Sequence, residues 1–152
     1  ELRVAYEPSI HIPLVVRYPT LFKAGSRPTV LASNVDIAPT MLALAGTVAP
    51  EGLDGVSLLP ALRGTTKQVR DGVLIEYYTD SVFGRLQNMG YKALRTTRWK
   101  YIRYGELVGM DELYDLQEDP AELNNLLPDR APSGVLSALE AELDAQLGNA
   151  AP

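Results

Sequence analysis

Four short runs rich in aromatic and β-branched residues limit what the second half of this chain can fold into. The runs are Val73–Tyr78, Tyr91–Thr96, Trp99–Tyr104 and Glu112–Leu116. The short connection Thr96-Thr97-Arg98 joins the second run to the third, a pattern typical of an antiparallel meander. In the third run Trp99, Tyr101 and Arg103 alternate with the residues between them, so we expect one face of this strand to be buried.

An amphipathic helix is predicted after these runs, over Ser133–Leu147. Its leucines recur at spacings of three and four, which places them on one helical face: Leu136, Leu139, Leu143 and Leu147. Ser133 is the expected cap of this helix and Gly148 is its expected stop. We therefore predict that residues 71–152 form a small C-terminal subdomain, in which a four-stranded antiparallel sheet is covered by one helix.

The first half of the chain carries an apolar run of a different kind, Leu14-Val15-Val16, which does not alternate with polar residues. Such a run predicts a short strand over 13–17 that is buried on both faces, as in the interior of a parallel sheet. A strand of this kind needs a neighbour on each side, but residues 1–64 supply one clear helix and no second strand of comparable quality. We therefore predict an α/β fold class, in which residues 1–70 are the incomplete C-terminal end of a mixed α/β domain. Apolar faces left without neighbours would favour oligomerisation, a swapped edge or poor solubility.

Residues 36–46 predict the one clear helix of this half. Asp36 is the preferred N-cap, because Pro39 then falls in the first turn, where its missing N–H costs little. A capping box between Ser33 and Asp36 is the alternative, and it would place Pro39 deeper in the helix. Gly46 is the expected C-cap.

The residue types present exclude several classes of site. The chain has no Cys, which excludes disulfides, thiolate zinc sites, iron–sulfur clusters and a Cys nucleophile. A single histidine, His11, excludes any site built from several imidazoles. No apolar run approaches the roughly 18 residues of a membrane-spanning helix, so no membrane span is expected. No leader segment is recognisable, so we expect Glu1 to begin a mature chain or a fragment.

Charge is distributed unevenly along the chain. Residues 1–105 hold thirteen basic and eight acidic residues, whereas residues 106–152 hold one basic and eleven acidic residues. An acidic C-terminal third would repel phosphates, so no nucleic-acid partner is expected. The basic residues of the predicted strands and the loop before them form a basic cluster: Arg85, Lys92, Arg95, Arg98, Lys100 and Arg103. This cluster could face an anionic ligand, but the sequence favours a solvated strand face balanced by the acidic tail.

Five segments form a longer pattern that follows one order along the chain. They are AYEPSIHIPLVVRYP (5–19), SNVDIAPTMLALAG (33–46), GVSLLPALRG (55–64), LRTTRWKYI (94–102) and ELYDLQEDPAELNNL (112–126). Together they resemble the C-terminal portion of the sulfatases, in the alkaline-phosphatase-like superfamily. One such match would be weak, whereas five in family order and at sensible spacing make the resemblance specific.

The resemblance implies a fold and an activity. It implies the end of a mixed sheet between helices, followed by a small four-stranded antiparallel sheet with a helix. It implies a sulfuric ester hydrolase, in which a formylglycine made from Cys or Ser in a C/S-x-P-x-R motif attacks sulfur. A divalent cation, expected to be calcium in the intact family enzyme, would be held by carboxylates and an amide and would polarise the sulfate.

The catalytic parts of that family are not present in this chain. Ser26-Arg27-Pro28-Thr29-Val30 has the S-x-P spacing, but Val30 replaces the required Arg, so we treat the match as coincidence. The family's metal ligands would precede Glu1, and Leu2 stands where the family usually has an active-site Lys. We therefore expect no catalytic residue here, no calcium bound by this chain alone, and no activity without the missing N-terminal catalytic half.

A few residues remain that could contact a sulfated substrate in the intact enzyme. The candidates are Arg3, His11, Arg85, Gln87 and Asn88. His11 stands where the family usually has Arg, and the last three lie in the loop over 81–90, which often lines the family's substrate cleft. The expected partners are the missing catalytic half, or a second copy through the exposed sheet. The alternative function is a non-enzymatic relic or accessory module that binds a sulfated glycan or a protein. Members of the family are often exported, periplasmic or lysosomal, but this sequence shows no localisation signal.

Overall fold

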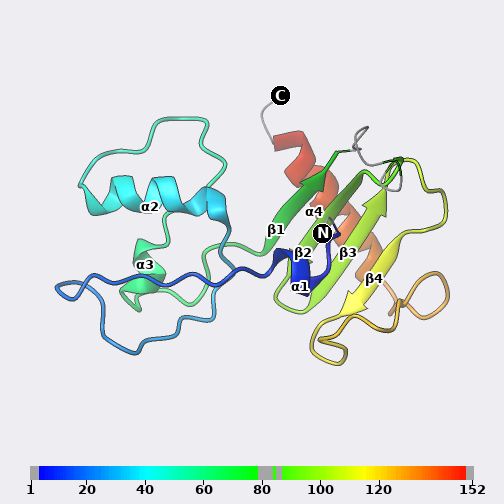
Figure 1. Cartoon of the computed structure of the whole chain (residues 1–152), viewed down its shortest axis with the longest axis horizontal. Coiled ribbons are helices and arrows are strands. Elements are labelled where there is room, and N and C mark those ends of the chain that lie inside the picture. Colours follow the sequence, from blue (N-terminus) through cyan, green and yellow to red (C-terminus); the bar gives the residue numbers. More distant parts are fainter. Residues whose placement is uncertain (1–3, 79–83, 85–86, 150–152) are drawn as a thin grey trace. The chain divides into compact units, whose positions relative to one another are not determined.

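The computed structural model describes residues 4–78, 84 and 87–149 (Figure 1). The chain separates into two compact units. The sheet unit combines the residues up to Ile12 with the chain from Leu74 onward, and the helical unit comprises Pro13–Val73. Each unit buries hydrophobic residues of its own.

The sheet unit is built around a four-stranded antiparallel sheet. Its strands neighbour one another in chain order: β1 (Gly72–Tyr77), β2 (Tyr91–Thr96), β3 (Trp99–Tyr104) and β4 (Glu112–Asp115). In the pairing of β2 with β3, Tyr91 lies opposite Tyr104 and Arg95 opposite Lys100. This meander, and the helix α4 (Val135–Asn149) after it, confirm the fold predicted for this part of the chain.

Both faces of this sheet are covered (Figure 1). On one face, leucines of α4 pack against the strands in a cluster of Leu94, Tyr101, Leu113, Leu139 and Leu143. On the other face, the N-terminal segment with α1 (Glu7–Ile10) lies over a cluster of Ala5, Tyr91, Ala93, Ile102 and Tyr114. The prediction of one buried face on β3 is therefore wrong, since Lys100, Tyr101 and Ile102 are all buried. The strand pattern could not reveal the second cover, because the segment that supplies it is distant in sequence.

The helix α4 differs from its prediction at both ends. Ala138 donates its backbone N–H to the carbonyl oxygen of Gly134 at 3.2 Å, which places Gly134 rather than Ser133 at the N-cap. The helix also continues through Gly148 to Asn149, because one glycine near a helix end costs only about 1 kcal/mol relative to alanine. Within the described ranges, every helix is too short or too polar to span a lipid bilayer.

The helical unit contains a short 3-10 turn, η1 (Asn34–Asp36), and the helices α2 (Ile37–Leu44) and α3 (Leu59–Leu62). The helix predicted over 36–46 is therefore present, and Gly46 ends it as expected. Gly46 has a φ of +71°, and its N–H donates to the carbonyl oxygen of Ala43 while Thr47 donates to Leu42. These two hydrogen bonds make a Schellman motif.

The N-terminal cap of this helical segment is the capping box, not the preferred Asp36 N-cap. Oδ2 of Asp36 accepts the backbone N–H of Ser33 at 2.8 Å, and the Asp36 side chain makes no cap bond to α2. The objection to the box was the position of Pro39. That objection fails because the 3-10 turn lies between the box and α2, so Pro39 is still in the first turn of α2.

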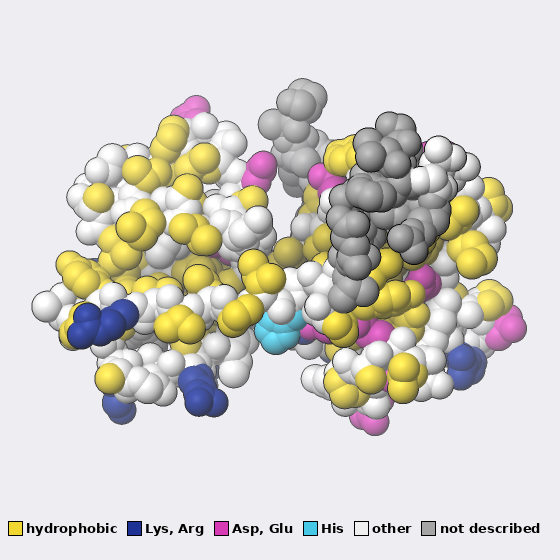
Figure 2. All heavy atoms as spheres, viewed as in Figure 1, with side chains coloured by type: hydrophobic (Ala, Val, Ile, Leu, Met, Phe, Trp, Pro, Cys, Tyr) yellow, Lys and Arg dark blue, Asp and Glu magenta, His cyan; other side chains and the backbone are white. Residues whose placement is uncertain are grey.

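The strand predicted over 13–17 is not formed, and its apolar side chains are exposed. The segment belongs to no sheet, and Val15 is 90% exposed. Figure 2 shows hydrophobic side chains at the surface over the helical unit. A strand needs partners for its backbone N–H and C=O groups. Among the described residues none pairs with this segment, so the run stays as an exposed extended chain.

Candidate functional site

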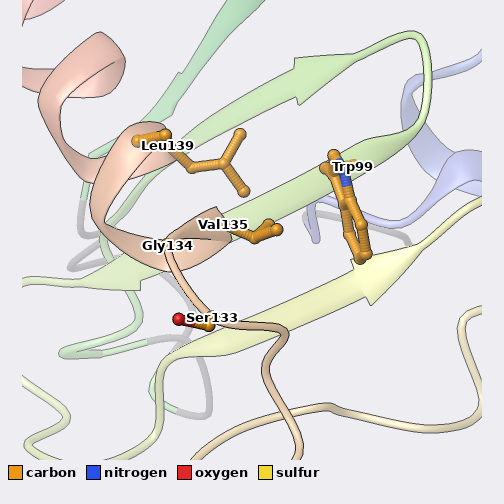
Figure 3. A pocket seen from close by; sticks show the side chains of 6 residues that line it. Trp99, Ser133, Gly134, Val135 and Leu139 are labelled. Atoms are coloured by element: carbon orange, nitrogen blue, oxygen red, sulfur yellow. The ribbon is translucent and has the colours of Figure 1, made fainter.

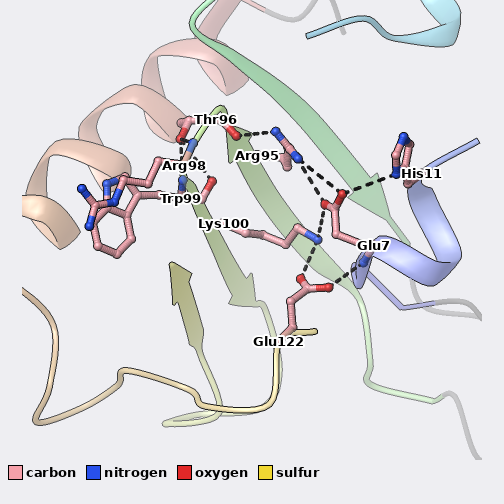
Figure 4. A network of polar contacts seen from close by, with 8 residues as sticks. All are labelled: Glu7, His11, Arg95, Thr96, Arg98, Trp99, Lys100 and Glu122. Carbon is pink, nitrogen blue, oxygen red and sulfur yellow. Dashed lines mark hydrogen bonds and ion pairs between the residues drawn. The ribbon is translucent and has the colours of Figure 1, made fainter. Parts of the chain in front are cut away.

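A buried ionic network surrounds Lys100 on β3 (Figure 4). Nζ of Lys100 lies 2.6 Å from Oε1 of Glu122 and 2.8 Å from Oε1 of Glu7. Nε of Arg95, on β2, lies 3.3 Å from the same Glu7 oxygen. Lys100 has no exposed area at all, and Glu122 is 8% exposed. We call these four residues the Lys100 network; it joins α1, two strands and the loop after β4.

Every carboxylate oxygen of the Lys100 network has a partner. Oε2 of Glu122 accepts the backbone N–H of Glu7 at 2.6 Å, and Oε2 of Glu7 accepts a guanidinium N–H of Arg95 at 3.4 Å. Burial alone would raise the pKa of Glu7, but the hydrogen bonds and charges of Lys100 and Arg95 outweigh it and hold that pKa below its ordinary value. Two anions and two cations thus compensate one another, as buried charges must.

A second polar cluster surrounds Glu112 at the start of β4. Its carboxylate accepts hydrogen bonds from the hydroxyls of Tyr6 at 2.8 Å, Tyr104 at 2.9 Å and Tyr114 at 2.5 Å. Burial, followed by the Glu112 carboxylate, raises the pKa of all three tyrosines above its ordinary value. These phenols therefore stay protonated as hydrogen-bond donors, and none is set up as a nucleophile.

The predicted substrate-binding residues are only partly described. Arg3 and Arg85 lie outside the described residues. His11 is exposed at the end of α1, where Figure 2 shows it at the surface, and its Nδ1 lies 3.9 Å from Oε2 of Glu7. Gln87 and Asn88 are exposed in a turn before β2, and Asn88 has a φ of +63°. The structure thus places His11 beside Glu7, and a substrate-binding role for these residues stays a prediction.

Arg85 apart, the cations of the basic cluster are described, and carboxylates of the same chain neutralise them. The described pairs are Lys92–Glu76, Arg95–Glu7, Arg98–Asp115, Lys100–Glu7, Lys100–Glu122 and Arg103–Asp144. Three of these carboxylates come from the acidic tail, which agrees with the expected balance. The predicted solvated face is confirmed for Arg98, whose side chain is 46% exposed. It is wrong for Lys100, which is fully buried. Hydrogen bonds from Arg98 hold the pKa of Asp115 below its ordinary value.

The residues that the structure describes do not fit a calcium ion. Calcium takes six to eight oxygen ligands, of which several are usually carboxylates. Among the described residues, no group of three or more His, Asp or Glu side chains is placed to hold a metal ion. The closely placed carboxylates of Glu7 and Glu122 are already bridged by the ammonium group of Lys100. The ammonium group of Lys100 therefore occupies the position between the two carboxylates that a metal ion would need.

Two hollows in the sheet unit carry little polar chemistry. The larger, of about 410 Å³, lies between Trp99 and the first turn of α4, and Ser133 supplies the one side-chain hydroxyl of its lining (Figure 3). The smaller, of about 190 Å³, is lined by residues at the end of β1 and the start of β2, among them Tyr77, Tyr91 and Lys92. Neither lining pairs a nucleophile with a base.

Sequence reasoning missed the Lys100 network. It placed Lys100 on a solvated face, because charge runs usually are solvated, and it gave Glu7 and Glu122 no role. One feature could have found them: each member lies within a segment that carries the family resemblance, 5–19, 94–102 or 112–126. A charged residue within one such segment is a candidate for a buried ion pair with a residue of opposite charge in another segment.

Comparison with known proteins places the chain in a family. Residues 1–149 match the family described as N-sulphoglucosamine sulphohydrolase, C-terminal. The chain is 34% identical over 125 residues to an N-acetylglucosamine-6-O-sulfatase of Bacteroides thetaiotaomicron, and 39% identical over 129 residues to arylsulfatase K of Homo sapiens. These matches cover 82% and 80% of this chain but 22% and 23% of those proteins. The chain thus spans less than a quarter of the length of these curated relatives.

Solved structures agree with this assignment. A protein solved in complex with its substrate, D-glucosamine-2-N,6-O-disulfate, is 29% identical with a TM-score of 0.79, over 88% of this chain and 27% of that chain. A 2-O GAG sulfatase is 33% identical with a TM-score of 0.64, over 76% of this chain and 24% of that chain. A phosphonate monoester hydrolase of Agrobacterium radiobacter is 28% identical with a TM-score of 0.55, over 75% and 24%. The chain belongs to the sulfatase family and corresponds to the C-terminal portion of its members.

Proposed function

We propose that this chain is the C-terminal portion of a sulfuric ester hydrolase that acts on sulfated amino sugars. The observation that carries the proposal is the match over residues 1–149 to a sulfohydrolase family. The substrate class is supported by two relatives, one named as an N-acetylglucosamine-6-O-sulfatase and one solved with a sulfated glucosamine. The chemistry itself would come from polypeptide other than this chain, which has no Cys and no C/S-x-P-x-R motif. Calcium, where the intact enzyme uses it, would be held there as well.

In this proposal the chain contributes to recognition of the substrate. Arg3, His11, Arg85, Gln87 and Asn88 would contact the sulfated sugar. Support comes from the exposure of His11, Gln87 and Asn88, and from the 190 Å³ hollow whose tyrosines flank the loop that carries the last three. Tyrosine rings can pack against a sugar while their hydroxyls stay polar.

The helical unit would bind the catalytic half through its exposed apolar run, and a second copy of this chain is the competing occupant. Leu14, Val15 and Val16 are all exposed, and Met41 on α2 is 61% exposed. Their composition suits burial between neighbouring strands and helices better than contact with water. Size-exclusion chromatography with light scattering would test this expectation. A stable monomer that forms no complex with the catalytic half would refute it.

The central experiment is reconstitution of the enzyme. The purified 152-residue chain, supplied with calcium, should not hydrolyse 4-nitrophenyl sulfate or glucosamine-6-sulfate. Co-expression with an N-terminal portion that bears the C/S-x-P-x-R motif should give turnover, and changing the Cys or Ser of that motif to alanine is the control. Turnover by the chain alone would refute the proposal. Absence of turnover by the two co-expressed portions, once the formylglycine is shown to be formed, would also refute it. A phenylphosphonate monoester belongs in the same assay, since one structural relative hydrolyses phosphonate monoesters.

The substrate contacts can be tested in the reconstituted pair. Asn88→Gly removes the amide but tolerates the positive φ, so it separates recognition from backbone strain. We expect Asn88→Gly and His11→Ala to raise KM while kcat changes less. The exposed Asn124→Gly serves as a matched control, and equal KM values in all three variants would remove these residues from the site.

A non-enzymatic module that binds a sulfated glycan through the basic cluster is the alternative. The ion pairs described above leave Lys92, Arg95, Arg98, Lys100 and Arg103 with carboxylate partners, which weakens its motivation. Salt-sensitive binding of this chain to heparin at low ionic strength would favour the alternative. We expect no such binding.

A further inference from the structure

The helix α1 is held in place by unusual means. It has four residues, and none of them is buried. An isolated turn of this length is not stable in water, and none of its own side chains is fully buried against the sheet. Beside it, Ala5 is buried and Tyr6 stacks edge-on against Tyr114 with ring centroids 6.1 Å apart. Another interaction must therefore set the position of the turn itself.

The Lys100 network supplies that interaction at the first residue of α1. Glu7 is held twice, because its backbone N–H donates to Glu122 and its side chain accepts from Lys100. The N–H is one of the unpaired donors at the start of any helix, and the buried Glu122 carboxylate satisfies it. Both contacts meet at the Lys100 ammonium group, which is fully buried under the turn.

Glu122 adopts a backbone conformation that its position would not otherwise favour. Its φ is +55°, in the left-handed region where glycine or asparagine is the ordinary choice. Residues other than glycine persist there only when the surrounding structure over-determines them. A glycine at this position would relieve the strain but would offer no carboxylate to Lys100 and Glu7. The side chain therefore explains why this position carries a glutamate.

We propose that Lys100 and Glu122 are positioning residues, which act through Glu7 to fix α1 and the adjacent His11 over the sheet. The side chains of Lys100 and Glu122 are 0% and 1% exposed, so neither would touch a substrate. The inference rests on the proposed function only for the substrate that His11 would meet. The anchoring of α1 can be judged without any activity.

Hydrogen exchange on the 152-residue chain tests the anchoring. Lys100→Met keeps the length of the side chain but leaves the Glu7 and Glu122 carboxylates facing each other without the ammonium group. The amides of Ser9, Ile10 and His11, which donate within α1, should then exchange about 100-fold faster, as loss of a buried pair implies. The amides of β2 and β3 should accelerate far less, because their sheet and both hydrophobic clusters remain.

Two further variants separate anchoring from general destabilisation. Lys100→Met combined with Glu122→Gln removes one charge of each sign and keeps an oxygen for the Glu7 N–H, so most of the protection of α1 should return. Arg103→Met removes another cation from β3, but its partner Asp144 is exposed, so α1 should be unaffected. Unchanged exchange of α1 in Lys100→Met, or equal acceleration of every amide, would overturn the proposal.

The consequence for His11 has its own readout. His11 is the single histidine of the chain, so its two imidazole C–H signals can be assigned directly, and Lys100→Met should shift and sharpen them toward those of a free segment. In the reconstituted enzyme the same variant should raise KM more than it lowers kcat, and the double variant should restore KM. Faster exchange of the α1 amides with an unchanged KM would support the anchoring of α1 by Lys100 and Glu122. The same result would overturn the statement that His11 contacts the substrate. Failure of reconstitution itself would count against the proposed function and leave the exchange result intact.

Discussion

Replacement of Asp36 by alanine should unfold the helical unit while the sheet unit stays folded. Asp36 is fully buried, and its carboxylate accepts the backbone N–H groups of Ser33 and Val56 at 2.8 Å each and pairs with Arg70. It therefore ties together the turn before α2, the chain leading to α3 and the residues that precede β1. Few hydrophobic residues of this unit are buried, so this polar centre carries an unusual share of its stability.

The magnitude follows from the partners that Asp36→Ala would leave behind. Each backbone N–H that loses its acceptor in a buried position costs about 1–3 kcal/mol. Arg70, whose side chain is 16% exposed, would lose its counter-ion, although partial exposure reduces that penalty. Both hydrogen bonds are only partly buried, so we expect a loss of roughly 3 kcal/mol, which is a large part of the roughly 5–15 kcal/mol that stabilises a typical domain.

Hydrogen exchange resolved by peptide would measure this effect, because it reports on each unit separately. In Asp36→Ala, peptides over 33–46 and 55–64 should lose their protection while peptides of β2 and β3 keep theirs. Asp71→Ala is the matched control, since Asp71 is an exposed aspartate of the same unit whose carboxylate contacts only the exposed side chain of Gln68 among the described residues. Protection of 33–46 that survives in Asp36→Ala would refute the reasoning.

Three further expectations follow from the packing and the charges. Leu143→Ala should lower the free energy of unfolding of the sheet unit by about 3 kcal/mol in urea titrations followed by tryptophan fluorescence, because Leu143 has no exposed area. Gly55→Ala should destabilise the helical unit, since its Cβ would clash with the backbone carbonyl oxygen of Val35, whereas Gly105→Ala meets no atom within 4 Å and should be neutral. The lowered pKa of Glu7 means that its charged form stabilises the fold at neutral pH. That contribution should fade as the pH falls below the ordinary carboxyl range and through the lowered value, and urea midpoints of Glu7→Gln should lack this part of the acid dependence.

Local patterns of the sequence were enough to predict the strands, the leucine stripe of α4 and the glycine that ends α2. Each depends on neighbours within a few residues: runs of aromatic and β-branched residues for the strands, the three-and-four spacing for Leu139 and Leu143, and a glycine after the last helical turn for Gly46. The capping box at Ser33 was foreseen as an alternative. The sequence favours the Asp36 cap because the box would place Pro39 deeper in the helix, and no local pattern reveals that a 3-10 turn comes between the box and α2.

What depends on distant contacts could not be predicted. The second buried face of β3 and the burial of Lys100 both arise because residues 5–10 fold back over the sheet, and no periodicity near β3 encodes that return. A lysine on a strand is usually solvated, so the rule that placed Lys100 in water is sound on average and fails here. The failure needs two carboxylates from distant segments, Glu7 and Glu122, which the linear pattern does not bring together.

The wrong strand over 13–17 has a different cause, and it bears on how this chain would associate. The pattern describes a segment that suits two strand neighbours, but the described residues provide none, so Val15 remains exposed while the cations of β2 and β3 are already paired. Among the described residues, the feature left without the neighbours its pattern predicts is therefore the apolar run over 13–17, not the cations of β2 and β3. An association driven by this run should persist in 1 M salt, at which the Debye length falls to about 3 Å, whereas one driven by the basic cluster should dissociate. Sedimentation at low and high salt distinguishes the two, and a complex that falls apart in salt would show that the charges, not the apolar run over 13–17, hold the partner.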